Sequence, residues 1–191
     1  MDRKHRLRLF VAADLDATVV PRVCDEIAAL ATAGADLRWS SAEHLHVTLK
    51  FLGDTEPARR PAIENALRRV ASSRQPIAWG LRGIGRFPDR GRPRVLWIGI
   101  DGEGALIDLA ERIDRALGEL GLPRESRAFA PHLTIGRVRG PTGLARLGAL
   151  IAARGPAFTV AMPALAAIRL YASELRPEGA VHRMLAEAPL G

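Results

Sequence analysis

Hydrophobic and polar residues follow two different periods along this chain. In some segments they alternate, which predicts β-strands because successive side chains of a strand point to opposite faces. In others the apolar residues recur every three or four positions, as on the buried side of a helix. The alternating or extended segments are residues 7–13, 42–53, 77–87, 94–100, 132–138, 157–162 and 165–175. The helical segments are residues 16–33, 56–72, 104–120 and 142–153.

The same order of elements occurs twice, in the approximate halves 6–90 and 91–187. Each half runs through strand, helix, strand, helix and extended chain, which indicates an internal duplication. One tetrapeptide supports it, because HVTL at 46–49 and HLTI at 132–135 share the form His-x-Thr-aliphatic and belong to the third element of their half. No stretch rich in Gly, Ser or charge separates the halves, so we expect residues 1–191 to form one domain with two lobes.

The two motifs predict a polar face on each strand. Residues two apart on a strand share a face, so the His and the Thr of each motif should point the same way. These four residues are His46, Thr48, His132 and Thr134. Val47, Leu49 and Phe51 should then point into the core. If a pseudo-two-fold axis relates the lobes, both polar faces meet in one cleft, where two hydroxyls and two imidazoles suit a phosphate.

Two histidines on opposite sides of a phosphorus atom form a complete acid–base pair. A neutral imidazole accepts the proton of the attacking nucleophile, and a protonated one gives a proton to the departing oxygen, each contributing roughly 10²–10⁴-fold. This chemistry requires no metal or other cofactor. No carboxylate stands at metal-ligand spacing beside either motif, and a metal-dependent phosphodiesterase is kept as an alternative.

The net charge of +7 indicates an anionic partner such as nucleic acid. Only Lys4 and Lys50 are lysines among the 28 basic residues, and so strong a bias to arginine fits either codon usage or selection for RNA binding. The Pro/Gly-rich loop 85–94 concentrates four of the arginines, which are Arg86, Arg90, Arg92 and Arg94. This loop is either a solvated hairpin tip or a binding loop.

Cysteine content and hydropathy bear on the compartment. Cys24 is the only cysteine, which excludes internal disulfides and fits a reducing environment. No apolar run approaches the roughly 20 residues of a membrane-spanning helix, and the start of the chain does not resemble a secretory signal. We expect a cytoplasmic protein that acts as a monomer and does not bind a membrane.

The two motifs and their flanking segments resemble the 2H phosphoesterases, in particular the RNA 2′,3′-cyclic phosphodiesterase branch, which is also called 2′-5′ RNA ligase-like. The resemblance covers about residues 6–186 and is carried by RLFVAADL, HLHVTLKFLG, RVLWIGI, PHLTIGRV and LYASELRPEGAVHRML. It implies an α+β fold with two pseudo-two-fold-related lobes, each a mainly antiparallel sheet with flanking helices, and an active-site cleft between them. It further implies metal-independent hydrolysis of RNA or nucleoside 2′,3′-cyclic phosphate ends to 2′-phosphates, with His46 as proton donor and His132 as proton acceptor.

Further candidates surround the motifs. The family carries an arginine at the position of Arg137, and a bulge at Gly136 would turn Arg137 toward the histidine face. Lys50, on the face of Thr48, either adds charge to the cleft or is solvated. Phe10 either lies under a nucleobase or packs in the core. His44 is expected on the same strand face as His46, as a rim residue.

The remaining aromatic and histidine residues are expected outside the site. Tyr171 is expected in the core, and His5 and His182 have no motif context. Val11 stands where relatives often have another aromatic, which weakens the case for base stacking. Two other functions use the same cleft, namely an RNA ligase that runs the reaction in reverse and a module that binds RNA ends without turnover.

Overall fold

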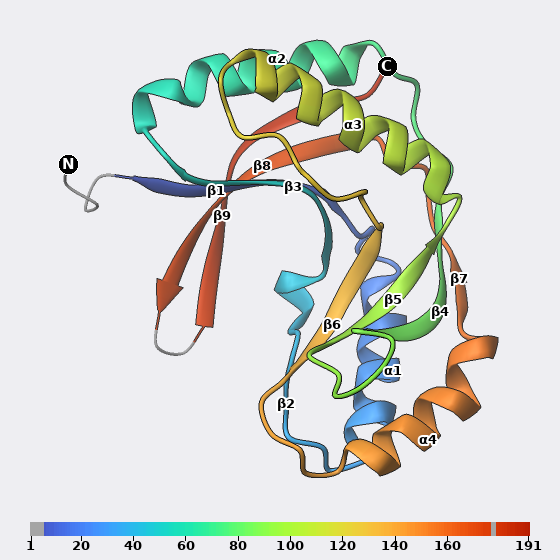
Figure 1. Cartoon of the computed structure of the whole chain (residues 1–191). Helices are drawn as coiled ribbons and strands as arrows, with labels where there is room; N and C mark the ends of the chain where they lie inside the picture. Colours follow the sequence, from blue (N-terminus) through green and yellow to red (C-terminus); the bar gives the residue numbers. More distant parts are fainter. Residues whose placement is uncertain (1–5, 177–178) are drawn as a thin grey trace.

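The computed structural model describes residues 6–176 and 179–191, so that His5 lies outside the described residues. Within these residues, nine strands and four α-helices form an α+β fold with one large antiparallel sheet (Figure 1). The strands are β1 (Leu7–Asp14), β2 (Leu37–Trp39), β3 (His46–Thr55), β4 (Gly80–Phe87), β5 (Val95–Asp101), β6 (His132–Val138), β7 (Thr159–Ala161), β8 (Ala167–Arg176) and β9 (Gly179–Pro189). The helices are α1 (Val20–Ala31), α2 (Arg60–Ser72), α3 (Glu103–Glu119) and α4 (Leu144–Arg154).

The strand order of the sheet is β7-β4-β5-β6-β3-β1-β8-β9, and β2 pairs with β6 outside this path. Its two central strands, β3 and β6, are joined by one residue pair, Val47 and Leu133. Outward from this junction, β1 corresponds to β5, β8 to β4 and β9 to β7. Strands from both sequence halves therefore stand on each side of the junction.

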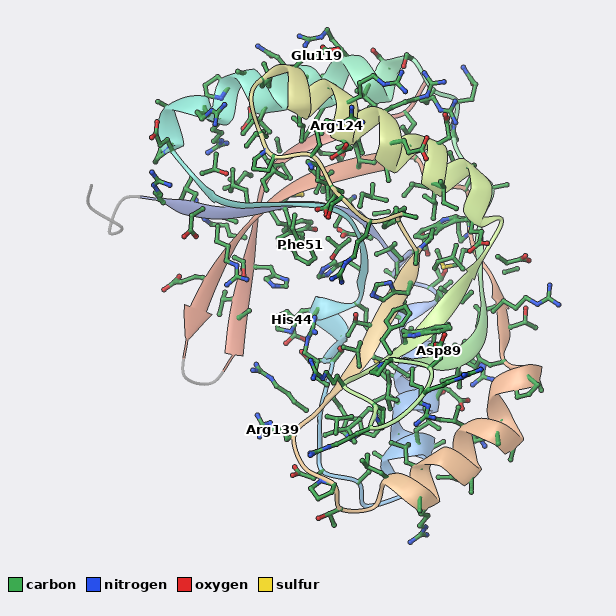
Figure 2. The ribbon with its side chains drawn as sticks, viewed as in Figure 1. His44, Phe51, Asp89, Glu119, Arg124 and Arg139 are labelled. Atoms are coloured by element: carbon green, nitrogen blue, oxygen red, sulfur yellow. The ribbon has the colours of Figure 1, made fainter. Side chains whose placement is uncertain are left out.

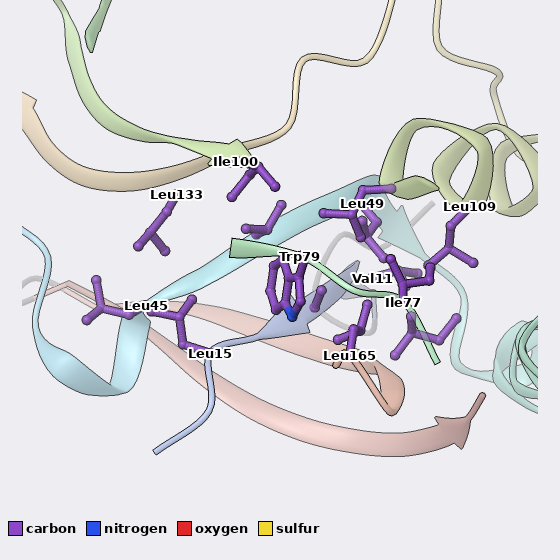
Figure 3. Close-up of a cluster of buried hydrophobic side chains, with 14 of the residues drawn as sticks. Val11, Leu15, Leu45, Leu49, Ile77, Trp79, Ile100, Leu109, Leu133 and Leu165 are labelled. Atoms are coloured by element: carbon purple, nitrogen blue, oxygen red, sulfur yellow. The ribbon is translucent and has the colours of Figure 1, made fainter. Parts of the chain in front are cut away.

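One pair of helices lies over the strands on each side of the β3–β6 junction. Helices α2 and α3 contact each other, α2 packs on β8 and β9, and α3 packs on β3, along the top of Figure 1. Helices α1 and α4 contact each other beside β4, at the lower right. Figure 3 shows part of the buried core, where Val11 of β1, Leu49 of β3 and Leu109 of α3 belong to one cluster. No helix in the described part of the chain is long and apolar enough to cross a membrane.

Several elements differ from the predictions. The strand expected over 42–53 begins only at His46, because Ala42–His44 form a turn of 3₁₀ helix. The first helix begins at Val20 rather than at residue 16, since the Asp16 carboxylate accepts hydrogen bonds from the backbone and hydroxyl of Thr18 and holds a turn there. Strands β2 and β9 were not predicted.

Each central strand contains a β-bulge just after its His-x-Thr motif. In β3 the register against β1 shifts between Val11 and Ala12, and Leu49 and Lys50 are both buried. The shift turns Phe51, 60% exposed, away from the core, so the prediction that Phe51 packs in the core is wrong.

Strand β6 contains the corresponding shift, located against β5 between Leu96 and Trp97. Ile135 and Gly136 are both buried, and Arg137 after them is exposed. The bulge expected at Gly136 is therefore present. A side chain at Gly136 would press against Leu37 and Trp39 of β2, which explains why a residue without a Cβ stands at this point.

Candidate active site

The two His-x-Thr motifs lie side by side at the centre of the sheet. Val47 and Leu133, the middle residues of the motifs, are paired across the β3–β6 junction and are completely buried. Because side chains alternate along a strand, the flanking residues point to the opposite face. These residues are His46, Thr48, His132 and Thr134, all partly exposed. The junction thus gathers two imidazoles and two hydroxyls on one face.

Aromatic rings surround the His46 imidazole. It stacks on Phe10 with ring centroids 5.0 Å apart, and the His182 ring lies 5.3 Å away with its edge toward it. Phe10 in turn stacks on Tyr171 at 5.3 Å. Phe10 is only 3% exposed, so its surface is used for packing beneath His46 and leaves none for a nucleobase.

Tyr171 and His182 are site residues that the sequence analysis assigned elsewhere. Both line a pocket of about 210 Å³ together with His46 and Asp14. The sequence gives little indication of their role, because the pattern of residues does not predict β9. Without β9, the pairing with β8 that brings His182 beside His46 is not apparent. The expectation that Tyr171 belongs to the core is wrong, since it is half-buried and lines this pocket.

Asp14 anchors the inner wall of this pocket. It is the cross-strand partner of His46, and its Oδ2 accepts hydrogen bonds from the Tyr171 hydroxyl at 2.5 Å and from Arg169 Nη1 at 2.7 Å. Burial and the hydrogen bond to Asp14 raise the pKa of Tyr171, so the phenol stays protonated and acts as a donor. The network holds a carboxylate near the His46 imidazole.

The surroundings of His46 favour its neutral form. Burial lowers its pKa most, the nearby His182 and His44 lower it further, and the value is about 4. The Asp14 carboxylate raises the pKa, but by less than burial lowers it. Burial also lowers the pKa of His182. At neutral pH the His46 imidazole is therefore uncharged in the free protein.

His132 is held in a defined orientation on the other central strand. Its Nδ1 lies 2.8 Å from the carbonyl oxygen of Ala130, which can only accept, so Nδ1 carries the proton of this hydrogen bond. The edge of the ring also contacts Phe87, with centroids 5.1 Å apart. In the neutral imidazole this tautomer leaves Nε2 as a proton acceptor.

Lys50 lies in neither of the places expected for it. The β3 bulge turns it to the helical side of the sheet, where it is 2% exposed, so it neither reaches the cleft nor is solvated. Its Nζ donates to Asp114 Oδ1 at 2.6 Å and to the Pro123 carbonyl at 2.9 Å. Burial raises the pKa of Asp114, but hydrogen bonds from Lys50, Arg124 and the Glu125 backbone outweigh it and bring the pKa to about 2.

His44 is not on the strand face of His46. It ends the 3₁₀ turn before β3 (Figure 2). Its Nε2 donates to the carbonyl of Ala180 in β9 at 2.8 Å, and its ring lies at right angles to that of His182 with centroids 4.9 Å apart. Arg137 is exposed on the histidine face, directly after the bulge of Ile135 and Gly136. Among the described residues, no three His, Cys, Asp or Glu side chains are grouped so that they could hold a metal ion.

Known proteins are similar to this chain over most of its length. The family model of the 2′-5′ RNA ligase superfamily matches residues 19–172. The RNA 2′,3′-cyclic phosphodiesterase of Methanothermobacter thermautotrophicus is 33% identical over 93% of this chain and 95% of its own length. The protein of the same name from Thermotoga maritima is 30% identical over 95% of this chain and 94% of its own.

Solved structures extend the similarity to the whole fold. The protein TT0787 of Thermus thermophilus superposes with a TM-score of 0.80 at 27% identity, covering 96% of this chain and 98% of its own. E. coli LigT complexed with 3′-AMP gives a TM-score of 0.74 at 25% identity, covering 97% and 98%. The resemblance to the 2H phosphoesterases is therefore confirmed, and the chain belongs to the 2′-5′ RNA ligase superfamily.

Proposed function

We propose that this protein hydrolyses the 2′,3′-cyclic phosphate at the end of an RNA strand or nucleoside to a 2′-phosphate. The observation that carries the proposal is the junction of β3 and β6, which gathers both His-x-Thr motifs on one face. The names of relatives that cover almost the whole chain support the same reaction.

We further propose that the two sides of the sheet act as two lobes related by a pseudo-two-fold axis, with the substrate between them. The matching strand order on either side of the junction supports this reading. In a regular antiparallel ladder, the register of Val47 with Leu133 makes His46 and His132 diagonal neighbours, about 7–8 Å apart. That spacing suits two groups on either side of one phosphorus atom.

In the proposed reaction, water attacks phosphorus and the bond to the 3′ oxygen breaks. Nε2 of His132 accepts the proton of the water, a role that its tautomer favours. His46 gives a proton to the departing 3′ oxygen, so the product carries a free 3′-hydroxyl and a 2′-phosphate. Thr48 and Thr134 donate hydrogen bonds to the non-bridging oxygens, and Arg137 contributes positive charge at the rim.

The donor role of His46 requires a proton that the free protein does not hold at neutral pH. Its pKa of about 4 must therefore rise when substrate binds. A phosphodiester anion beside the imidazole favours the charged form and supplies such a rise. Asp14, across the strand pair, acts in the same direction.

The test is turnover of 2′,3′-cyclic AMP and of an oligoadenylate ending in a 2′,3′-cyclic phosphate, both in excess EDTA, with the product isomer identified. We expect 2′-phosphate products from the wild type and loss of most of kcat in His46→Ala and in His132→Ala, with circular dichroism confirming the fold. Arg115→Ser, an exposed change on α3, is the matched control.

The other outcomes point to other functions. Joining of the cyclic end to a 5′-hydroxyl would support the ligase alternative, and binding without turnover would support the binding module. Loss of activity in EDTA with recovery on adding a divalent cation would support a metal-dependent enzyme. Near-normal kcat in either folded histidine variant would contradict the two-histidine mechanism.

A further inference from the structure

The arginines of the described residues differ in their partners. Several on and near the helices pair with carboxylates, for example Arg74 with Asp108 at 2.6 Å and Arg154 with Glu26 at 2.7 Å. Arg124, at the upper end of Figure 2, pairs with Asp114. Other arginines are exposed and, within the described residues, form no ion pair with a carboxylate, including Arg115 and Arg146 on the helices. Five of these arginines belong to the loop between β4 and β5 and to the end of β6, and they are Arg90, Arg92, Arg94, Arg137 and Arg139.

These five arginines gather where the loop between β4 and β5 meets the end of β6. Arg86 shapes the loop by donating to the carbonyls of Asp89 and Gly91 at 3.0 and 3.1 Å. Arg92 Nη2 reaches the carbonyl of Arg139 at 3.4 Å, and the Arg94 carbonyl accepts from the backbone of Val138 at 2.9 Å. Figure 2 shows Arg139 projecting from the chain after β6. The contacts fix the loop against β6.

These segments enclose a groove of about 730 Å³, lined by Pro88, Arg92, Pro93, Arg94 and Val138. We call it the basic groove. Its wall combines guanidinium groups with proline rings. Guanidinium groups match phosphate oxygens with paired hydrogen bonds, and apolar surface between them suits the ribose and base of a nucleotide. Asp89 is the one acidic side chain within the loop 85–94.

The basic groove begins beside the candidate active site. Phe87 contacts the His132 ring, and the next residue, Pro88, lines the groove. Val138 lines it six residues beyond His132 on the same strand, about 20 Å away at the usual rise of a strand. Arg137 is exposed on the histidine face between these two points. A chain of nucleotides whose end lies at His132 can therefore extend into the groove.

We propose that the basic groove binds the phosphodiester backbone of single-stranded RNA adjacent to the terminal cyclic phosphate. This rests on the proposed function and deepens it, because it makes an RNA strand, rather than a free mononucleotide, the preferred substrate. Arg92 and Arg94 contact backbone phosphates, and the exposed ring of Pro88 packs against a nucleoside. Sequence preference is weak, since contacts to phosphates carry no base information.

The first measurement compares kcat/KM for a short oligoadenylate ending in a 2′,3′-cyclic phosphate with kcat/KM for 2′,3′-cyclic AMP. The wild type prefers the oligonucleotide, and in the double variant Arg92→Ser/Arg94→Ser that preference falls about ten- to thirtyfold at 0.1 M salt, from two lost phosphate contacts. The control Arg115→Ser/Arg146→Ser removes the same charge from exposed positions on α3 and α4 and keeps the preference.

The second measurement is binding of a fluorescent oligoadenylate with a terminal 2′-phosphate as salt is varied. The slope of log affinity against log salt becomes shallower by about 1.4 in the groove variant and stays unchanged in the control. Equal preference and equal slope in the two double variants would overturn the proposal. If the wild type binds the oligonucleotide with the expected slope but turns over neither substrate, the proposed function fails while the groove assignment stands.

Discussion

His46 carries the clearest electrostatic signature at the scale of single residues. Its imidazole is neutral in the free protein because burial and two neighbouring histidines lower its pKa to about 4. At neutral pH, such a group takes up a proton only when its pKa rises, and a negative charge arriving beside it raises the pKa. Substrate binding and proton uptake are therefore coupled in the proposed mechanism.

We predict that inorganic phosphate or 2′-AMP raises the pKa of His46. NMR titration of the histidine ring signals should give a value near 4 in the free protein and a higher value in the complex. The signals are assigned by comparison with His46→Gln. If the pKa stays near 4 in the complex, His46 cannot serve as the proton donor. The neutral His46 imidazole would then be assigned the role of proton acceptor.

The threonines of the motifs should contribute to binding of the phosphate throughout the reaction. Thr48→Ala or Thr134→Ala removes a hydrogen bond to a charged oxygen, worth about 1.5–3 kcal/mol, and should lower kcat/KM roughly ten- to a hundredfold. Thr32→Ala, an exposed change at the end of α1, is the control. Steady-state kinetics with 2′,3′-cyclic AMP tests this, and a loss below twofold in both motif variants would contradict the assigned role.

At the scale of elements, the two bulges decide which side chains reach the site. Alternation read from the sequence predicts the wrong faces for Phe51 and Lys50, because one extra residue in a strand reverses the faces of the side chains that follow, here as far as a second register shift at Leu52. On β6 the bulge could be predicted, because a glycine inside a strand, Gly136, often marks one. On β3 the corresponding residue is Lys50, and a lysine does not indicate a bulge.

The buried pair of Lys50 and Asp114 joins β3 to α3 and to the segment that leads to His132. Lys50→Met leaves the Asp114 carboxylate buried with fewer donors and should cost about 3–5 kcal/mol in free energy of unfolding. Arg124→Met removes an exposed partner of the same carboxylate and should cost no more than about 1 kcal/mol. Urea unfolding measures both free energies of unfolding. Equal losses in the two variants would contradict the conclusion that Lys50 is the main partner of the Asp114 carboxylate.

The same pair predicts how stability depends on acid. The pKa of Asp114 is about 2 in the folded state, below the ordinary value near 3.9, so its contribution is complete above about pH 4 and is lost as the pH falls toward 2. The melting temperature of the wild type should therefore fall more steeply between pH 4 and pH 2 than that of Asp114→Asn. Parallel curves for the two proteins would show that this carboxylate is not responsible.

At the scale of the whole molecule, most elements could be predicted because their periods are strong and local. All four helices and the strands with His-x-Thr motifs were found from period alone. Strand β2 has three residues and exists through its pairing with β6, and β9 exists through its long pairing with β8. Such partners lie far along the chain, so neither these strands nor the approach of His182 to His46 could be predicted from local pattern.

Mixing of the sequence halves within one sheet predicts a single unfolding transition. β1 of the first sequence half pairs with β8 of the second, and α3 of the second half packs on β3 of the first. Unfolding of either sequence half therefore removes strand pairing and packing from the other. Fluorescence from the tryptophans and far-ultraviolet circular dichroism should give coincident urea transitions. Two separated transitions would show that the sides of the sheet unfold independently.

The mirrored strand order also has a consequence for how the two motifs could diverge. A chain of half this length, with one motif, would leave its central strand uncovered and would need a second copy of itself to complete the sheet. In such a homodimer, a substitution in one motif would be present in both subunits. In a single chain each position can differ, and the bulge is followed by phenylalanine after Lys50 on one strand and by arginine after Gly136 on the other.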